Sequence, residues 1–104
     1  MRIRYSRHAA RRLAERRLAA EWVEAAIREP EYECPDPDDP DLTRAYRTID
    51  GAGGVVIRVV YSMKSAQELL VVTAFFDADA GPLLKRERAR YLDARRRRRD
   101  RRPG

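Results

Sequence analysis

The 104-residue sequence contains one cysteine, one histidine and no apolar run approaching the roughly 20 residues that would be needed to span a membrane. Cys34 cannot form an internal disulfide, and His8 and Cys34 together fall short of the four ligands of a structural zinc site. The first residues, Met1–Tyr5, lack the apolar stretch of a secretory signal. We therefore expect a cytoplasmic protein that uses no metal or other cofactor and does not bind a membrane.

Lysine is also scarce, so almost all of the 23 basic side chains are arginines, and they are distributed unevenly. Residues 85–102 hold eleven basic side chains and three acidic ones, a net charge of +8, whereas the whole chain carries +6. Residues 1–84 therefore carry −2. The length and this charge distribution predict one domain over residues 1–82, followed by an arginine-rich helix or tail over residues 83–104.

The apolar pattern predicts helices first and strands afterwards. In order, we expect a short edge strand at 2–5, helices at 7–17 and 20–29, strands at 43–50, 55–62 and 69–76, and a helix at 83–102 that frays into disorder. This order predicts an α+β fold in which two N-terminal helices pack on an antiparallel sheet of three or four strands. The expected core residues are Trp22, Val23, Ile27, Ile57, Val59, Val71 and Phe75.

The first helix contains a candidate catalytic group on one side. His8, Arg12, Glu15 and Arg16 fall within an arc of roughly 100° at helical spacing. Histidine can exchange a proton near neutral pH, and arginine can stabilise a charged phosphate, which are the requirements of metal-free RNA cleavage. The alternative is a solvated helix face in which Glu15 pairs with Arg11 or Arg12.

A second candidate group lies on the strands. Arg58 and Thr73 interrupt the two most apolar strands, and Arg47 lies on the neighbouring one. A charge within such a run is costly unless it is paired or faces a cleft. Arg58 is therefore predicted to face a functional cleft, and the alternative is that it pairs with an acid such as Glu15 or Asp50.

The C-terminal arginine run allows three interpretations. It can attract phosphates without sequence specificity, with an affinity that falls steeply as salt rises. It can be a solvated terminus with no binding role. It can also be a helix docked through Leu84, Tyr91 and Leu92 onto the sheet or onto a partner.

Several short segments of residues 3–78 together resemble a known family. They are Ser6–Ala9, Arg12-Leu13, Glu15-Arg16, the spaced Val23, Ile27 and Pro30, Ile57–Tyr61 and Val71–Phe75. This pattern resembles an uncharacterised bacterial domain-of-unknown-function family that is grouped with RelE- and BrnT-like toxins. The resemblance implies a toxin-like, metal-independent endoribonuclease that acts on RNA and is held in check by an antitoxin protein.

The resemblance also implies roles for individual residues. His8 would be the general acid or base, Arg58 would stabilise the transition state from the sheet, and Arg12 or Arg16 would contact phosphate. The predicted catalytic residues are therefore His8, Arg58 and Arg16, and the predicted substrate-binding residues are Arg12, Arg47, Tyr61 and Thr73. The alternative function is a non-catalytic module of the same fold that binds a protein or a nucleic acid.

Overall fold

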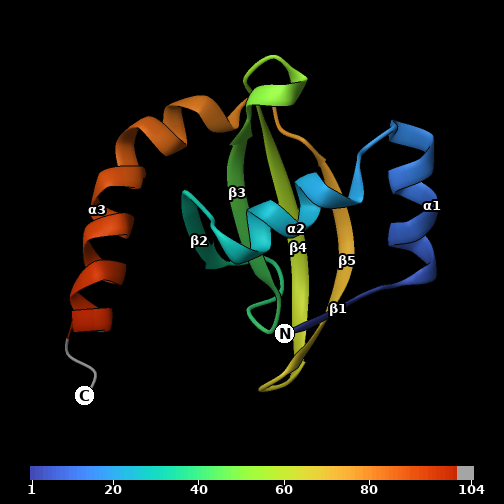
Figure 1. Cartoon of the computed structure of the whole chain (residues 1–104), viewed down its shortest axis with the longest axis horizontal. Coiled ribbons are helices and arrows are strands. Elements are labelled where there is room, and N and C mark those ends of the chain that lie inside the picture. The colour runs from blue at the N-terminus through green and yellow to red at the C-terminus, as the bar shows by residue number, and fades with distance from the viewer. Residues whose placement is uncertain (101–104) are drawn as a thin grey trace.

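A computed structural model describes residues 1–100, and within that range the chain has an α+β fold with one five-stranded sheet (Figure 1). The α+β prediction is therefore confirmed. In chain order the elements are β1 (Arg2–Tyr5), α1 (Arg7–Arg16), α2 (Ala20–Arg28), β2 (Tyr32–Pro35), β3 (Thr43–Ile49), the 3-10 helix η1 (Asp50–Ala52), β4 (Val55–Ser65), β5 (Glu68–Phe76) and α3 (Ala80–Asp100).

The sheet has the strand order β1-β5-β4-β3-β2 and is mixed, which corrects the expected antiparallel sheet of three or four strands. Strands β2 to β5 pair antiparallel, whereas β1 pairs parallel to β5. The prediction missed β2 because its four residues, Tyr32–Pro35, include an acid and end in a proline, and both residue types are depleted in strands. The parallel pairing of β1 joins segments far apart in the sequence, which no local pattern reveals.

Helices α1 and α2 form around the signals seen in the sequence. The Oγ of Ser6 accepts a hydrogen bond from the Ala9 N–H at 3.0 Å, which confirms Ser6 as the N-cap of α1. Helix α1 ends at Arg16, and the following residue, Arg17, caps it in a left-handed conformation with φ 54°. Helix α2 ends before Pro30, as expected.

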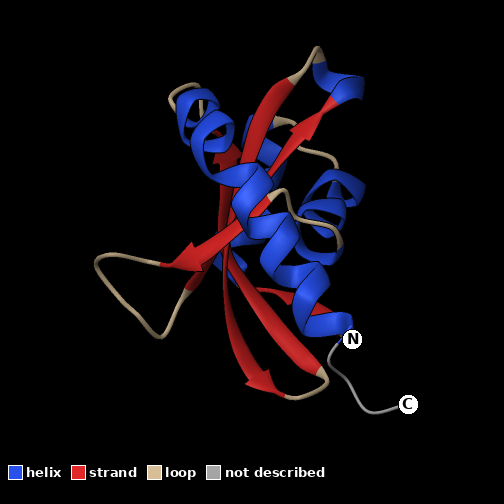
Figure 2. Ribbon diagram, turned by 90° about the vertical axis from the view of Figure 1, so that its left-hand side faces the viewer, coloured by secondary structure: helices blue, strands red, loops and turns tan. Residues whose placement is uncertain are grey.

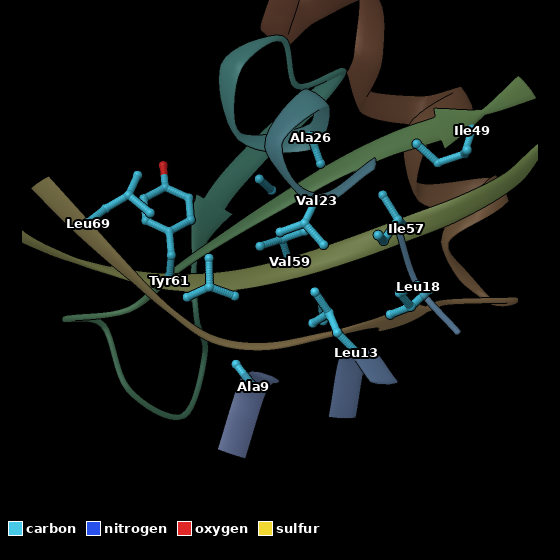
Figure 3. Packing of buried hydrophobic residues seen from close by; sticks show 13 residues of the cluster. Ala9, Leu13, Leu18, Val23, Ala26, Ile49, Ile57, Val59, Tyr61 and Leu69 are labelled. Atoms are coloured by element: carbon cyan, nitrogen blue, oxygen red, sulfur yellow. The ribbon is translucent and has the colours of Figure 1, made fainter. Parts of the chain in front are cut away.

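The main core lies between α1, α2 and one face of the sheet, as Figure 3 shows. Four of the predicted core residues are buried there, and Trp22 and Ile27 pack against them while partly exposed. The four buried residues are Val23, Ile57, Val59 and Val71.

Phe75 was wrongly assigned to this core, because β5 contains a bulge. Val71 and Thr73 pair with consecutive residues of β4, so Val72 between them is an extra residue. One extra residue reverses the alternation of side chains that follow it in the strand. Val71 therefore faces the helices, whereas Phe75 lies on the opposite face of the sheet.

Helix α3 packs on that opposite face and beside β2, at the far end of the sheet from α1 (Figure 1). Seen from its own side in Figure 2, it lies across the strands. Its first turns bury Ala80 and Leu84 against Tyr46 in a second, smaller cluster. Tyr91 also attaches the helix, through a hydrogen bond from its hydroxyl to Glu33 of β2, whereas Leu92 is 38% exposed. Docking through Leu84 and Tyr91 thus supports the interpretation of this segment as a packed helix.

Helix α3 begins at Ala80, so the boundary expected between residues 82 and 83 falls inside it. The helix continues through Arg95–Arg99 to Asp100, which corrects the expectation that it frays over the arginine run. The last expected helical residues, Arg101 and Arg102, lie outside the described range. No helix formed by residues 1–100 is both long enough and apolar enough to cross a membrane.

Candidate functional site

Arg58 extends from β4 on the sheet face opposite α1 and α2, where it stacks on an aromatic ring. Its partner across the sheet is Phe75, and the Arg58 Cζ lies 4.3 Å from the centroid of that ring. One Arg58 Nη lies 3.6 Å from a carboxylate oxygen of Asp77, and the side chain is 21% exposed. The buried Nε has no hydrogen-bond partner among residues 1–100. The guanidinium is therefore held by a cation–π contact and one long ion pair, with donors left unused.

Arg16 reaches the same ring from α1. Its Nη1 donates a hydrogen bond of 2.8 Å to the Ala74 carbonyl, and its Cζ lies 5.7 Å from the Phe75 centroid. This contact falls on the part of β5 beyond the residues that pair with β1. Two arginines that the sequence predicted as catalytic thus converge on Phe75, and we call Arg16, Arg58, Phe75 and Asp77 the arginine cluster.

The arginine cluster is suited to an anion. It contains two guanidiniums and a single carboxylate, that of Asp77, so it carries a net positive charge. A guanidinium presents its N–H groups in a planar fork that matches the oxygens of a phosphate. The cluster can therefore bind phosphate and stabilise charge that develops on it.

His8 and Arg12 lie on α1 outside this cluster. His8 is exposed, and it precedes Arg16 by eight residues, or about 12 Å along the helix axis. Arg12 pairs with Glu15 at 3.1 Å, the pairing named above as the alternative for this helix face. Arg12 lies one helical turn from His8 and one from Arg16, so it occupies the space between them.

The remaining predicted site residues divide between the two faces of the sheet. Thr73 is half-buried on the same face as Arg58, two residues before Phe75 on β5. Arg47 is on the other face, where it donates a 2.6 Å hydrogen bond to the Glu29 carbonyl at the end of α2. The structure therefore brings Thr73 near the arginine cluster, but not Arg47.

Tyr61 also lies on the face of the sheet that α1 and α2 cover, away from the arginine cluster. It is buried in the main core, and its hydroxyl donates a 2.6 Å hydrogen bond to the Glu33 carboxylate. Burial, followed by this hydrogen bond, raises the pKa of Tyr61 far above its ordinary value. The phenol is therefore neutral and engaged at physiological pH.

Two members of the arginine cluster were missed as functional residues. Phe75 was assigned to the core, and Asp77 was not singled out, although pairing of Arg58 with an acid was the alternative to a functional cleft. The acid is Asp77, rather than Glu15 or Asp50. One signal for Asp77 was available in the sequence. This acid directly follows the strand that pairs with the strand of Arg58. The bulge, which decides where Phe75 points, left no trace in the sequence.

The described residues offer little other chemistry near this face. Cys34 is half-buried, and burial is the main cause that raises the pKa of its thiol. A protonated thiol is a poor nucleophile. Within residues 1–100, no three His, Cys, Asp or Glu side chains gather in a way that could hold a metal ion.

Comparison with known proteins gives one match. A family model described as a domain of unknown function, DUF4258, matches residues 5–76. That span includes Arg16, Arg58 and Phe75, whereas Asp77 and α3 lie beyond it. No curated protein matches, and no solved structure does.

Proposed function

We propose that this chain, which belongs to the DUF4258 family of domains of unknown function, binds single-stranded RNA and cleaves it without a metal ion. The observation that carries the proposal is the convergence of Arg16 and Arg58 on Phe75, because paired guanidiniums recognise phosphate oxygens. A RelE- or BrnT-like toxin of the bacterial cytoplasm, restrained by an antitoxin protein, is the biological role that we propose for such an activity.

The proposed RNA path runs between α1 and β5. A phosphate beside Arg12 would lie one helical turn from both His8 and Arg16, within reach of their side chains. Arg16 and Arg58, which meet at Phe75, would then contact this same phosphate from the side of β5. Thr73 lies on the same sheet face as Arg58 and would contact the RNA beside this phosphate.

The proposed reaction uses the RNA itself as the nucleophile. The 2′-oxygen attacks the adjacent phosphorus while its proton passes to His8, and the bond from phosphorus to the 5′-oxygen breaks. The departing oxygen takes a proton from solvent water and His8 releases its proton to solvent, so the products are a 2′,3′-cyclic phosphate and a 5′-hydroxyl. The arginines stabilise the extra negative charge on the five-coordinate phosphorus.

The test is cleavage of a single-stranded RNA by the purified protein in the presence of EDTA, with the product ends identified by mass spectrometry. We expect 2′,3′-cyclic phosphate ends, and we expect Arg58→Ala to lower the rate roughly 10²–10³-fold, as the loss of one preorganised donor does. Arg4→Ala is the control, because Arg4 lies on the edge strand β1 and pairs with Glu68 of β5, outside the arginine cluster. Cleavage that requires a divalent metal, or full activity of Arg58→Ala, would contradict the proposal.

A second candidate function is RNA binding without cleavage. It is favoured by the position of His8, which lies about 12 Å along α1 from Arg16 and outside the arginine cluster. If intact RNA is recovered after long incubation, while Arg58→Ala weakens RNA binding and Arg4→Ala does not, the binding module is the correct interpretation.

A further inference from the structure

We propose that a groove between the C-terminal half of α3 and the edge strand β2 binds phosphates of single-stranded RNA. This α3 groove encloses about 470 Å³ and is lined by Glu33, Tyr91, Arg95, Arg98 and Arg99. It lies at the end of the sheet opposite α1, so it is separate from the arginine cluster. The inference rests on the proposed function only for the choice of RNA as the ligand.

The one acid in the α3 groove is already engaged by neutral donors. Glu33 accepts a 2.6 Å hydrogen bond from the Tyr61 hydroxyl on one carboxylate oxygen and a 2.7 Å hydrogen bond from the Tyr91 hydroxyl on the other. Neither oxygen forms an ion pair with an arginine among residues 1–100. The groove therefore holds three guanidiniums against one carboxylate, a net charge of +2, and that carboxylate is bound to tyrosine hydroxyls rather than to the arginines.

The arginines of α3 separate into paired and unpaired sets. Arg96 and Arg97 pair with Asp93, at 3.7 and 3.1 Å. Arg98 and Arg99, which line the groove, form no ion pair with any residue of the described range. The uncompensated positive charge of this segment is thus concentrated on the groove side of the helix.

The third groove arginine is anchored by the end of α2. Arg95 makes a long 3.4 Å contact with the Arg28 carbonyl, which leaves its charge without a carboxylate partner in residues 1–100. Arg95 and Arg99 are four residues apart and therefore lie on the same side of α3, about 6 Å apart along its axis. Neighbouring cations at this spacing can contact one bound anion or consecutive phosphates of a strand.

The lining of the groove favours a nucleic acid over an acidic peptide. Among the described residues that line the 470 Å³ cavity, none is aliphatic, whereas peptide binding usually depends on an apolar anchor. Strand β2 also ends in Pro35, which has no N–H to pair with an added peptide strand. A phosphate backbone needs only the cations.

The neighbouring surface gives an RNA strand room to continue. An adjoining cavity of about 410 Å³ shares Glu33, Tyr91 and Arg98 with the α3 groove and extends along Pro35 and Thr43. Arg98 lies at the junction of the two cavities. It is therefore the residue that we expect to contribute most to binding.

The test compares two double variants that remove the same charge from the same helix. Arg98→Ala/Arg99→Ala removes two of the three groove arginines, whereas Arg96→Ala/Arg97→Ala removes the arginines paired with Asp93. Fluorescence anisotropy with a 2′-O-methyl oligouridylate measures binding without cleavage, because that probe lacks the attacking hydroxyl. We expect the groove variant to bind ~10-fold more weakly, with a salt slope shallower by about 1.4, while the matched variant stays within about twofold of the original protein.

Each other outcome overturns the inference. Equal weakening of both double variants would show a general effect of charge, and no weakening of the groove variant would show that RNA does not bind there. Displacement of the probe by polyglutamate as readily as by RNA would assign the groove to an acidic protein segment.

The same experiment separates this inference from the proposed function. If the groove variant binds normally while Arg58→Ala abolishes cleavage, the groove inference fails and the proposed function stands. If the groove variant alone loses binding and no cleavage is ever seen, the groove inference stands and the proposed cleavage function fails. Circular dichroism of both double variants checks that α3 remains helical.

Discussion

Arg58 illustrates how one residue can be both structurally accommodated and chemically available. A cation on one of the two most apolar strands of the sheet is stable only if its charge is offset. Phe75 offers the face of its ring at 4.3 Å, and Asp77 offers a carboxylate at 3.6 Å. These two contacts leave N–H donors of the guanidinium without an acceptor, so Arg58 keeps the capacity to bind an anion.

His8 is the residue on which the cleavage chemistry depends. We predict that His8→Ala lowers the single-turnover cleavage rate at saturating RNA by ~10²–10⁴-fold, the usual effect of losing a general acid or base. The unfolding midpoint should be unchanged, because His8 is exposed. Arg11→Ala on the same helix, also exposed, is the matched control. Undiminished cleavage by the His8 variant would remove this residue from the mechanism.

At the scale of elements, α2 holds the central strands of the sheet. It contacts β3 and β4 and contributes Val23 and Ala26, both with no exposed surface, to the main core. The neighbouring Ile27 packs against the same cluster but is partly exposed. The helix therefore sits in the register that the apolar spacing predicted.

We predict that Ile27→Ala lowers the free energy of unfolding by about 2 kcal/mol, the lower end of the range for such truncations, because part of the side chain already contacts water. Urea denaturation followed by circular dichroism measures the loss. Glu21→Ala, on the exposed side of the same helix, should change stability by less than about 0.5 kcal/mol. A loss of only a few tenths for the Ile27 variant would show that the side chain does not contribute to the core.

Across the whole molecule, the two arginine sites lie at opposite ends of one sheet. The arginine cluster is beside β5 and α1, and the α3 groove is beside β2. Residues 1–84 carry −2 and residues 85–102 carry +8, so α3 provides the positive field of the protein. An RNA that contacts both sites would have to span the width of the sheet.

The attachment of α3 makes the stability of the whole molecule sensitive to alkaline pH. Burial, followed by the hydrogen bond to Glu33, raises the pKa of Tyr91 from its ordinary value of 10.0 to about 12. The contribution of Tyr91 to stability is therefore complete below pH 10. Between pH 10 and 12 the unfolded chain loses this proton while the folded chain keeps it, so stability falls.

We accordingly predict that the free energy of unfolding of the original protein falls more steeply between pH 10 and 12 than that of Tyr91→Phe. Phenylalanine keeps the ring that packs edge-on against Tyr32, but it has no hydroxyl to titrate. Urea denaturation at a series of pH values gives the two slopes. Identical slopes would mean that the Tyr91 hydroxyl is not held by Glu33 in solution.

The sequence by itself determined the elements whose signals are local. Ser6 caps α1 through an amide three residues away, and Pro30 ends α2 through its own ring. The apolar runs of β3, β4 and β5 and the choice of Arg16 and Arg58 as candidate site residues likewise depend on nearby residues alone. Such signals survive in the sequence because the interactions that cause them span only a few positions.

The tertiary structure decided everything that depends on pairing between distant segments. The parallel contact of β1 with β5 and the convergence of Arg16 on Phe75 each join residues about 60 positions apart. The bulge at Val72 turned Phe75 from the core to the site, and the docking of α3 brought Tyr91 to Glu33. These contacts are fixed by the register of the strands and the packing of the layers, which depend on the whole chain folding together.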